Sequence, residues 1–106
     1  MIGIEGIGRL EADVLSIIWK HDKSLTVRDI YEEMRDSRKI AYTTVMTVLN
    51  NLTDKGILKQ DKTATAYVYS PKVSNEELAQ NLCQVIVDKL LFGKAAPLTS
   101  YFAGKR

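Results

Sequence analysis

The 106-residue chain has little of what metal centres, disulfide-stapled domains and membrane proteins require. It contains one cysteine, Cys83, and one histidine, His21, too few for an intrachain disulfide or for a thiolate or imidazole metal site. No apolar run approaches the ~20 residues of a membrane-spanning helix, and the N-terminus lacks the charge-then-apolar order of a secretory signal. We therefore expect a reduced, cytoplasmic protein without a metal, a cofactor or a membrane association.

The two scarce residues do not suggest catalysis either. His21 has no partner at metal-ligand spacing and lies in the polar stretch 21–24, which predicts a surface turn. Cys83 lies among Leu82, Val85 and Ile86, so we expect an inert buried thiol. Because no nucleophile is paired with a base, the sequence does not predict an enzyme.

Net charge is also small, at +2, but it is unevenly distributed. Residues 1–34 carry four Lys or Arg against seven Asp or Glu, whereas residues 35–62 carry six against three. A local basic excess can mark the footprint of a polyanion. Chance clustering gives the same pattern, so charge alone does not decide between the two interpretations.

The hydrophobic spacing predicts three helices in the first half of the chain. Apolar residues at helical spacing mark the first helix. Thr26, with Asp29 three residues later, predicts the N-cap of the second. Gly56 suits the left-handed position that follows the third. The expected spans are residues 9–20, from Thr26 to the polar run 35–39, and from residues 41–43 to Gly56.

The second half of the chain predicts a hairpin and further helices. Apolar and polar residues roughly alternate in ILKQDK and AYVYSP, on either side of a short polar tip, which is typical of a two-stranded hairpin ending at Pro71. Tyr67 and Tyr69 share one face of this hairpin and are expected to pack rather than to stack on bases. A capping-box signature at Ser74 predicts a fourth helix, and Pro97 suits the start of another.

The order helix, helix, helix, hairpin, helix is typical of the winged helix-turn-helix. This fold class is mainly α with a small β-hairpin wing, and its third helix enters the major groove of DNA. We expect a winged-helix DNA-binding domain in residues 1–72, followed by a C-terminal dimerisation helix and tail in residues 73–106.

The third predicted helix carries short polar side chains where a solvated helix usually carries Glu, Lys and Gln. Its other apolar positions, Val48, Leu49 and Leu52, lie within about 60° of Val45 around the helix and face the core. Threonine offers a hydroxyl and a methyl group to base edges, and asparagine can pair bidentately with adenine. Hydroxyls that merely decorate an exposed helix are the alternative, but several on one arc beside a basic segment favour DNA. The candidate contacts here are Tyr42, Thr43, Thr44, Thr47, Asn50 and Asn51.

Two flanking segments supply candidate contacts to phosphates. The hairpin tip contains Lys62, Thr63 and Thr65, whose side chains are of types that contact the DNA backbone. Arg38 and Lys39 precede the third helix and are candidates for the same role. A solvated turn and a solvated loop have the same composition, so both interpretations stay open.

The fourth predicted helix is apolar over more than one face. Ten of the nineteen residues between Ser74 and Phe92 are apolar, which is wider than the stripe of a surface helix. We expect it to bury against a second copy in a two-fold homodimer, since a winged helix that reads a two-fold operator needs one. Folding back on its own core is the alternative. The expected dimerisation residues are Leu78, Leu82, Val85, Ile86 and Leu90.

Four blocks of the chain resemble the penicillinase-repressor family (BlaI, MecI and CopY) of winged-helix transcriptional repressors. LEADVLSIIWK is similar to the family's opening helix, LTVRDIYEEM to its second helix, AYTTVMTVLNNLTDKGIL to its recognition helix, and AYVYSPKVSNEEL to its wing and the start of its dimerisation helix. The resemblance covers nearly the whole chain and implies a dimeric repressor of double-stranded operator DNA. It also implies a partner protease, membrane-bound and regulatory, that cuts within the dimerisation region.

The chain departs from this family in several places. Thr43, Met46 and Asn51 stand where many relatives carry basic residues, so the operator sequence is expected to differ. The cysteine cluster that ends the copper-responsive branch is absent, which argues against copper sensing. The segment 100–102 lies where the family is cut but lacks the Asn-Phe bond of staphylococcal members, and the chain stops at Arg106, short of the family's usual final helix.

A winged-helix protein-interaction module without sequence-specific DNA binding is the alternative function. The low net charge and the lack of an arginine on the third-helix face keep this alternative open. Measured binding to DNA would distinguish the repressor from the protein-interaction module.

Overall fold

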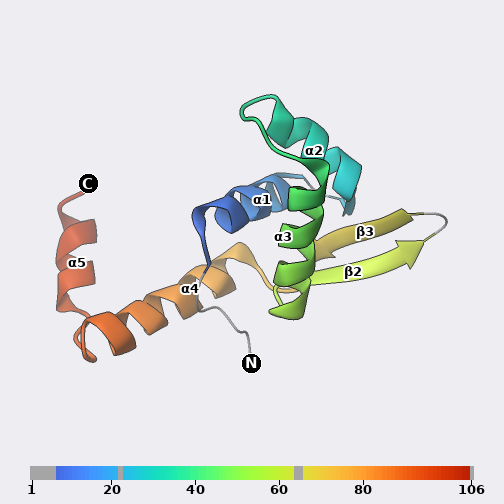
Figure 1. Ribbon diagram of the computed structural model, residues 1–106. Coiled ribbons are helices and arrows are strands. Elements are labelled where there is room, and N and C mark those ends of the chain that lie inside the picture. Colours follow the sequence, from blue (N-terminus) through green and yellow to red (C-terminus); the bar gives the residue numbers. More distant parts are fainter. Residues whose placement is uncertain (1–6, 22, 64–65, 106) are drawn as a thin grey trace.

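The computed structural model describes residues 7–21, 23–63 and 66–105 of the chain. Three helices pack against one another and against a small sheet, and the C-terminal helices extend to one side of this body (Figure 1). This arrangement confirms the predicted mainly α architecture with a hairpin. In chain order the elements are α1 (Arg9–Lys20), β1 (Leu25–Thr26), α2 (Val27–Arg35), α3 (Tyr42–Asp54), β2 (Leu58–Thr63), β3 (Ala66–Pro71), α4 (Asn75–Val85), the π-helical turn η1 (Ile86–Leu90) and α5 (Ala96–Ala103).

A reciprocal cap fixes the start of α2. Thr26 Oγ1 accepts a hydrogen bond from the backbone N–H of Asp29 at 3.1 Å, and Asp29 Oδ2 accepts one from the backbone N–H of Thr26 at 3.0 Å. Neither N–H group has an acceptor within the helix, so both would otherwise need water. The second helix therefore begins where the sequence predicts.

The C-terminal end of α3 is a Schellman motif built on Gly56. Gly56 has φ +81°, the left-handed conformation that glycine adopts without a steric penalty. The Gly56 N–H donates to the Thr53 carbonyl at 3.0 Å, and the Ile57 N–H donates to the Leu52 carbonyl at 3.0 Å. Ile57 and Leu52 are both fully buried, which supplies the hydrophobic contact that accompanies this motif. The motif turns the chain directly from α3 into the hairpin.

The sheet has one strand more than the sequence predicts. β3 lies between β2 and the short strand β1, and all pairs are antiparallel. In this register Leu25 lies opposite Tyr69, which is 2% exposed. Tyr67 is 48% exposed, so the expectation that both tyrosines pack is wrong for Tyr67. The hairpin extends beyond the helices (Figure 1), and only the end that carries Tyr69 lies over the core.

One hydrophobic core joins α1, α2, α3, the sheet and the first part of α4. Leu78 belongs to this core at 4% exposure, because the first turns of α4 lie against the winged helix. Leu82 and Val85 are only partly buried against it. The buried residues are Val14, Leu15, Ile18, Leu25, Val27, Ile30, Met34, Val45, Val48, Leu49, Leu52, Ile57, Leu58, Tyr69 and Leu78.

Beyond Val85 the chain leaves this core. The fourth helix starts as predicted, with Ser74 Oγ accepting from the Glu77 N–H at 2.9 Å, and it loosens into η1 before Phe92 and Gly93 reverse the chain at positive φ. Cys83 is exposed, so the expected buried thiol is wrong: α4 projects from the domain and leaves this face uncovered. None of the helices in the described part of the chain has the length and apolar character needed to cross a membrane.

Candidate nucleic-acid interface

The outward face of α3 is exposed over its whole length. Val45, Leu49 and Leu52 are fully buried and Val48 is 7% exposed, so these positions fix the rotation of the helix about its axis. The opposite face is therefore presented to solvent without any cost in core packing. Its exposed members include every candidate base contact on this helix: Tyr42, Thr43, Thr44, Thr47, Asn50 and Asn51, together with Met46.

Two of these side chains are already hydrogen-bonded within the protein. Thr47 Oγ1 donates to the Thr43 carbonyl at 3.0 Å, which leaves its methyl group and the oxygen lone pairs for a ligand. Asn50 Oδ1 accepts from the Tyr69 hydroxyl at 3.3 Å and from Gln60 Nε2 at 3.4 Å. Bidentate pairing of Asn50 with adenine would require its oxygen to release one of these donors.

The N-terminal end of α3 lies in a cationic hollow. The cap residue Ala41 has no side-chain acceptor, so the first N–H groups of the helix are not capped by a side chain. A hollow of about 430 Å³ at this end is lined by Arg9, Arg38, Lys39 and Thr44, among others. Helix N-terminal amides with nearby cations suit a phosphate.

Arg9 also lines this hollow, although nothing in the sequence spacing indicates it. It lies far from α3 in the chain and reaches the hollow only because α1 packs across α3. Arg38, a predicted contact, is held by an ion pair with Asp13 of α1. Lys39 is exposed, as a phosphate contact must be.

The wing supplies one described candidate. Lys62 is exposed, and its Nζ lies 5.7 Å from the centroid of the Tyr67 ring, its partner across the hairpin. Thr65 and the side chain of Thr63, also predicted contacts, lie outside the described residues. The structure therefore positions Lys62 of β2 beside the aromatic ring of Tyr67 on β3.

A groove of about 720 Å³ separates α3 from the wing. Tyr42, Met46 and Asn50 form its α3 wall, and Tyr67 belongs to its opposite wall. Sequence spacing does not predict this groove, because its walls come from segments that meet only in the folded chain. Its remaining lining residues are Thr26, Val27, Arg28, Gln60, Ala66 and Tyr69.

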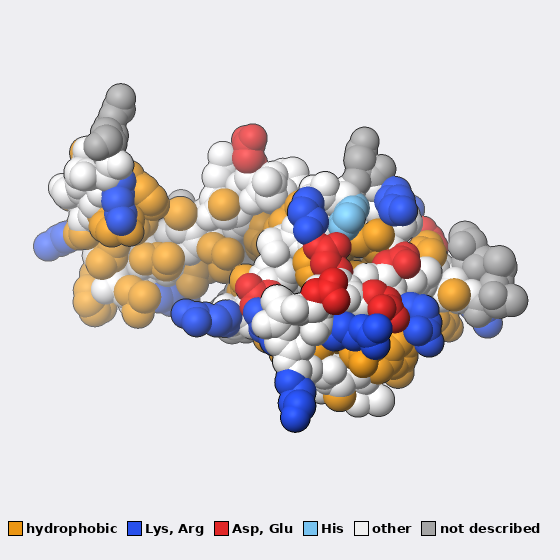
Figure 2. Space-filling view, turned by 90° about the horizontal axis from the view of Figure 1, so that it is seen from above, with side chains coloured by type: hydrophobic (Ala, Val, Ile, Leu, Met, Phe, Trp, Pro, Cys, Tyr) orange, Lys and Arg blue, Asp and Glu red, His pale blue; other side chains and the backbone are white. Residues whose placement is uncertain are grey.

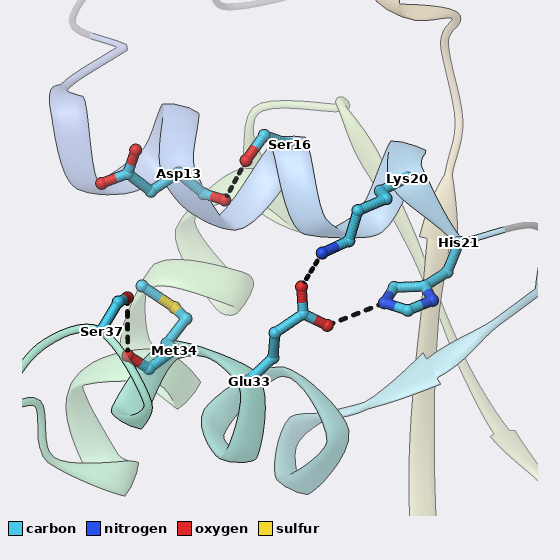
Figure 3. Close-up of polar contacts among 7 residues, drawn as sticks. All are labelled: Asp13, Ser16, Lys20, His21, Glu33, Met34 and Ser37. Carbon is cyan, nitrogen blue, oxygen red and sulfur yellow. Dashed lines mark hydrogen bonds and ion pairs between the residues drawn. The ribbon is translucent and has the colours of Figure 1, made fainter.

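Ion pairs hold α1 against α2 and against the C-terminal end of α3. Glu33 of α2 accepts from Lys20 Nζ and lies 2.8 Å from Nε2 of His21 (Figure 3). The hydrogen bond from Lys20, followed by that from His21, lowers the pKa of the Glu33 carboxyl. Lys55, just after α3, reaches Glu11 Oε2 of α1 at 2.8 Å. His21 thus lies in the turn after α1, as predicted, and joins that turn to α2.

Comparison with known proteins places the chain in a family. It matches the penicillinase repressor family over residues 7–106. The chain belongs to this family. The transcriptional regulator BlaI of Mycobacterium tuberculosis (strain ATCC 25618 / H37Rv) is 35% identical over 82 residues, which cover 77% of this chain and 59% of that protein. The penicillinase repressor of Staphylococcus aureus is 28% identical over 97 residues, which cover 92% of this chain and 76% of that repressor.

Two solved structures share the fold. The solution structure of the DNA-binding domain of the repressor BlaI has a TM-score of 0.64 and 28% identity, and covers 73% of this chain and 93% of that chain. The monomeric form of Bacillus licheniformis BlaI in complex with the blaP half-operator has a TM-score of 0.60 and 27% identity, with the same coverage. The chain spans 59% of the length of the mycobacterial regulator.

Proposed function

We propose that this protein is a transcriptional repressor that binds double-stranded operator DNA with α3 in the major groove. The observation that carries the proposal is the face of α3, which exposes short polar side chains opposite a fully buried apolar stripe. A helix in the major groove must approach base edges closely, and short side chains allow that approach. The complex of the monomeric form of B. licheniformis BlaI with the blaP half-operator supports the same role.

The candidate residues divide into two roles. Thr43, Thr47, Asn50 and neighbouring positions of α3 face base edges and would supply sequence preference. Arg9, Lys39 and the uncapped N-terminal amides of α3 surround one hollow and would hold a phosphate. Arg38 would join them after leaving Asp13, and Lys62 would contact the backbone from the wing.

The proposal includes a homodimer formed by the C-terminal region. Leu90 is 69% exposed, Phe92 86% and Phe102 57%, and hydrophobic side chains gather over the C-terminal helices (Figure 2). An apolar surface of this kind is expected to be buried against a partner. Since Leu78 serves the protein's own core, the dimer interface is assigned to Leu82, Val85, Ile86 and Leu90. The proposed dimerisation unit in residues 73–106 therefore begins with a turn of α4 that packs, through Leu78, on the proposed DNA-binding unit in residues 1–72.

Two further elements of the proposal concern the cellular setting. A repressor must reach operator DNA, which implies a cytoplasmic location. Inactivation by a regulatory protease would act on the C-terminal region, where Tyr101 and Phe102 of α5 are 56% and 57% exposed. Cleavage there would cut through the exposed apolar surface of the C-terminal helices, to which Phe102 belongs, and would so weaken the dimer and its binding to a two-fold site.

Selection from a pool of random duplexes tests the proposal. The wild-type chain is expected to enrich a two-fold sequence and to bind it at least ~10³-fold more tightly than a scrambled duplex. Fluorescence anisotropy at a stated salt concentration measures both affinities. Equal affinity for selected and scrambled duplexes would reject the repressor role and favour a protein-interaction module.

A further inference from the structure

The groove between α3 and the wing gathers the exposed large hydrophobic side chains of the winged helix. Among its described residues these are Tyr42 at 39%, Met46 at 39% and Tyr67 at 48% exposure, and all three line this groove. Single exposed apolar residues are ordinary, but a cluster on one face marks a contact surface. Met46 lies on the same arc of α3 as Tyr42 and Asn50, so its thioether chain forms the apolar part of the α3 wall.

Asn50 supplies the polar part of the same wall. Its Oδ1 has two lone pairs, and the Tyr69 hydroxyl and Gln60 Nε2 both donate to it. Tyr69 is 2% exposed, and Gln60 Nε2 also donates to the Tyr69 hydroxyl at 2.7 Å, so the three groups hold one another in place. The amide therefore presents Nδ2 to a ligand as a hydrogen-bond donor.

An apolar group beside a donor matches one base edge in the major groove. Thymine presents a C5-methyl group next to the O4 acceptor, whereas cytosine and adenine present amino donors and guanine has acceptors without a methyl group. We infer that Met46 and Asn50 together read one thymine in each operator half-site, Met46 contacting the methyl group and Nδ2 of Asn50 donating to O4. The inference rests on the proposed function and assigns a base specificity to this groove.

Removal of single methyl groups from the DNA tests the proposed contact with Met46. Each thymine of the duplex selected by the full chain is replaced in turn by deoxyuridine, which removes only the methyl group. One thymine per half-site is expected to show a loss of about fourfold in affinity, the factor that corresponds to burial of one methyl group. In Met46→Ala this thymine-to-uracil ratio should fall to about one, whereas Met46→Leu should keep it, because leucine retains the apolar contact.

A second base analogue tests the donor. A 5-methylcytosine·guanine pair at the same position keeps the methyl group but replaces O4 with an amino donor, so wild type should bind it at least ~10-fold more weakly. Asn50→Asp presents an acceptor and should reverse this preference, so that its own affinity is higher for 5-methylcytosine than for thymine. Thr43→Ala is the matched control: its total affinity changes, but both ratios at this base remain those of wild type.

The outcomes separate the inference from the function on which it rests. Selection that enriches no duplex rejects the repressor role itself. Selection of a duplex in which every thymine tolerates uracil, or in which Met46→Ala keeps the wild-type ratio, overturns only the thymine assignment. Because Met46 and Asn50 are exposed, the melting temperature of each variant is expected to match that of wild type. With equal melting temperatures, a changed ratio of affinities for the base analogues does not reflect unfolding.

Discussion

Thr47 and Leu49 lie two residues apart on α3 and face opposite directions, so they separate binding from folding at the scale of single residues. Leu49 is fully buried, and Leu49→Ala should lower the free energy of unfolding by ~2–5 kcal/mol through the cavity it leaves. Thr47 is exposed, so Thr47→Ala should leave stability within a few tenths of a kcal/mol. Its loss should instead weaken operator binding by ~1–3 kcal/mol. Urea melts beside operator titrations measure both effects, and wild-type binding by Thr47→Ala would contradict the assignment.

Glu33 makes stability depend on pH. Its pKa is lowered in the folded chain by the hydrogen bonds from Lys20 and His21, so folding favours the ionised carboxylate. The stabilisation is therefore fully present above the ordinary pKa of 4.5 and is lost as pH falls through the lower folded value. Glu33→Gln should be less stable than wild type at pH 7, and the difference should shrink below pH 4.5. Urea melts at several pH values test this, with Glu32→Gln as the neighbouring control; a difference that persists unchanged at low pH would contradict it.

At the scale of elements, the connection from α3 to the hairpin depends on Gly56. A Cβ atom there meets nothing within 4 Å, so the cost of Gly56→Ala comes from its φ of +81° alone. We expect a loss of ~1–2 kcal/mol of stability, because L residues are strained in the left-handed region. Gly56→Asn should lose less, since asparagine tolerates this conformation better.

Gly104→Ala is the matched control, because the φ of Gly104 is an ordinary −77° and a Cβ atom there would make only ordinary van der Waals contacts. Thermal melting distinguishes the variants. A melting temperature of Gly56→Ala equal to that of wild type would show that the left-handed conformation at this position does not destabilise an L residue.

The elements that the sequence predicted are those whose signals are local. Thr26 with Asp29, Ser74 and Gly56 mark helix ends through contacts within one turn, so reading along the chain finds them. β1 was missed because Leu25 becomes a strand residue only by pairing with Tyr69. Sequence spacing likewise found the exposed face of α3 but neither the Arg9 hollow nor the groove beside Met46, whose walls come from distant segments. The predicted burial of Cys83 is wrong because the apolar pattern of α4 does not show whether the residues that cover this face belong to the same chain.

At the scale of the whole molecule, the exposed apolar surface should hold two copies together. Ile86→Asp would place a charge in the proposed interface, at a cost of several kcal/mol. Because η1 has no buried residue, the monomer itself should keep its melting temperature. Gln80→Asp, on an exposed part of α4, is the control that adds the same charge elsewhere. Sedimentation should give a dimer for wild type and Gln80→Asp and a monomer for Ile86→Asp, and a wild-type monomer at micromolar concentration would reject the interface.

A repressor that binds as a two-fold dimer makes twice the phosphate contacts of one subunit. The salt dependence of its affinity measures the number of these contacts. Each neutralised phosphate adds about −0.9 to the slope of log affinity against log salt concentration. The full operator should therefore show about twice the slope of a half-operator, because two subunits contribute equal sets of contacts. Lys39→Ala should lower the steepness by about 0.9 on a half-operator and about 1.8 on the full operator. Arg9→Ala should do the same, because Arg9 lines the same hollow and is assigned to the same phosphate.

The uncharged outward face of α3 provides the control for this measurement of the slope. Thr47→Ala removes a proposed base contact without removing charge, so it should lower affinity and leave both slopes unchanged. Fluorescence anisotropy between ~50 and ~200 mM salt covers the range in which the effect is large. Equal slopes on half and full operators would contradict binding by two equivalent subunits. Unchanged slopes for both Lys39→Ala and Arg9→Ala would place the phosphate outside the hollow at the start of α3.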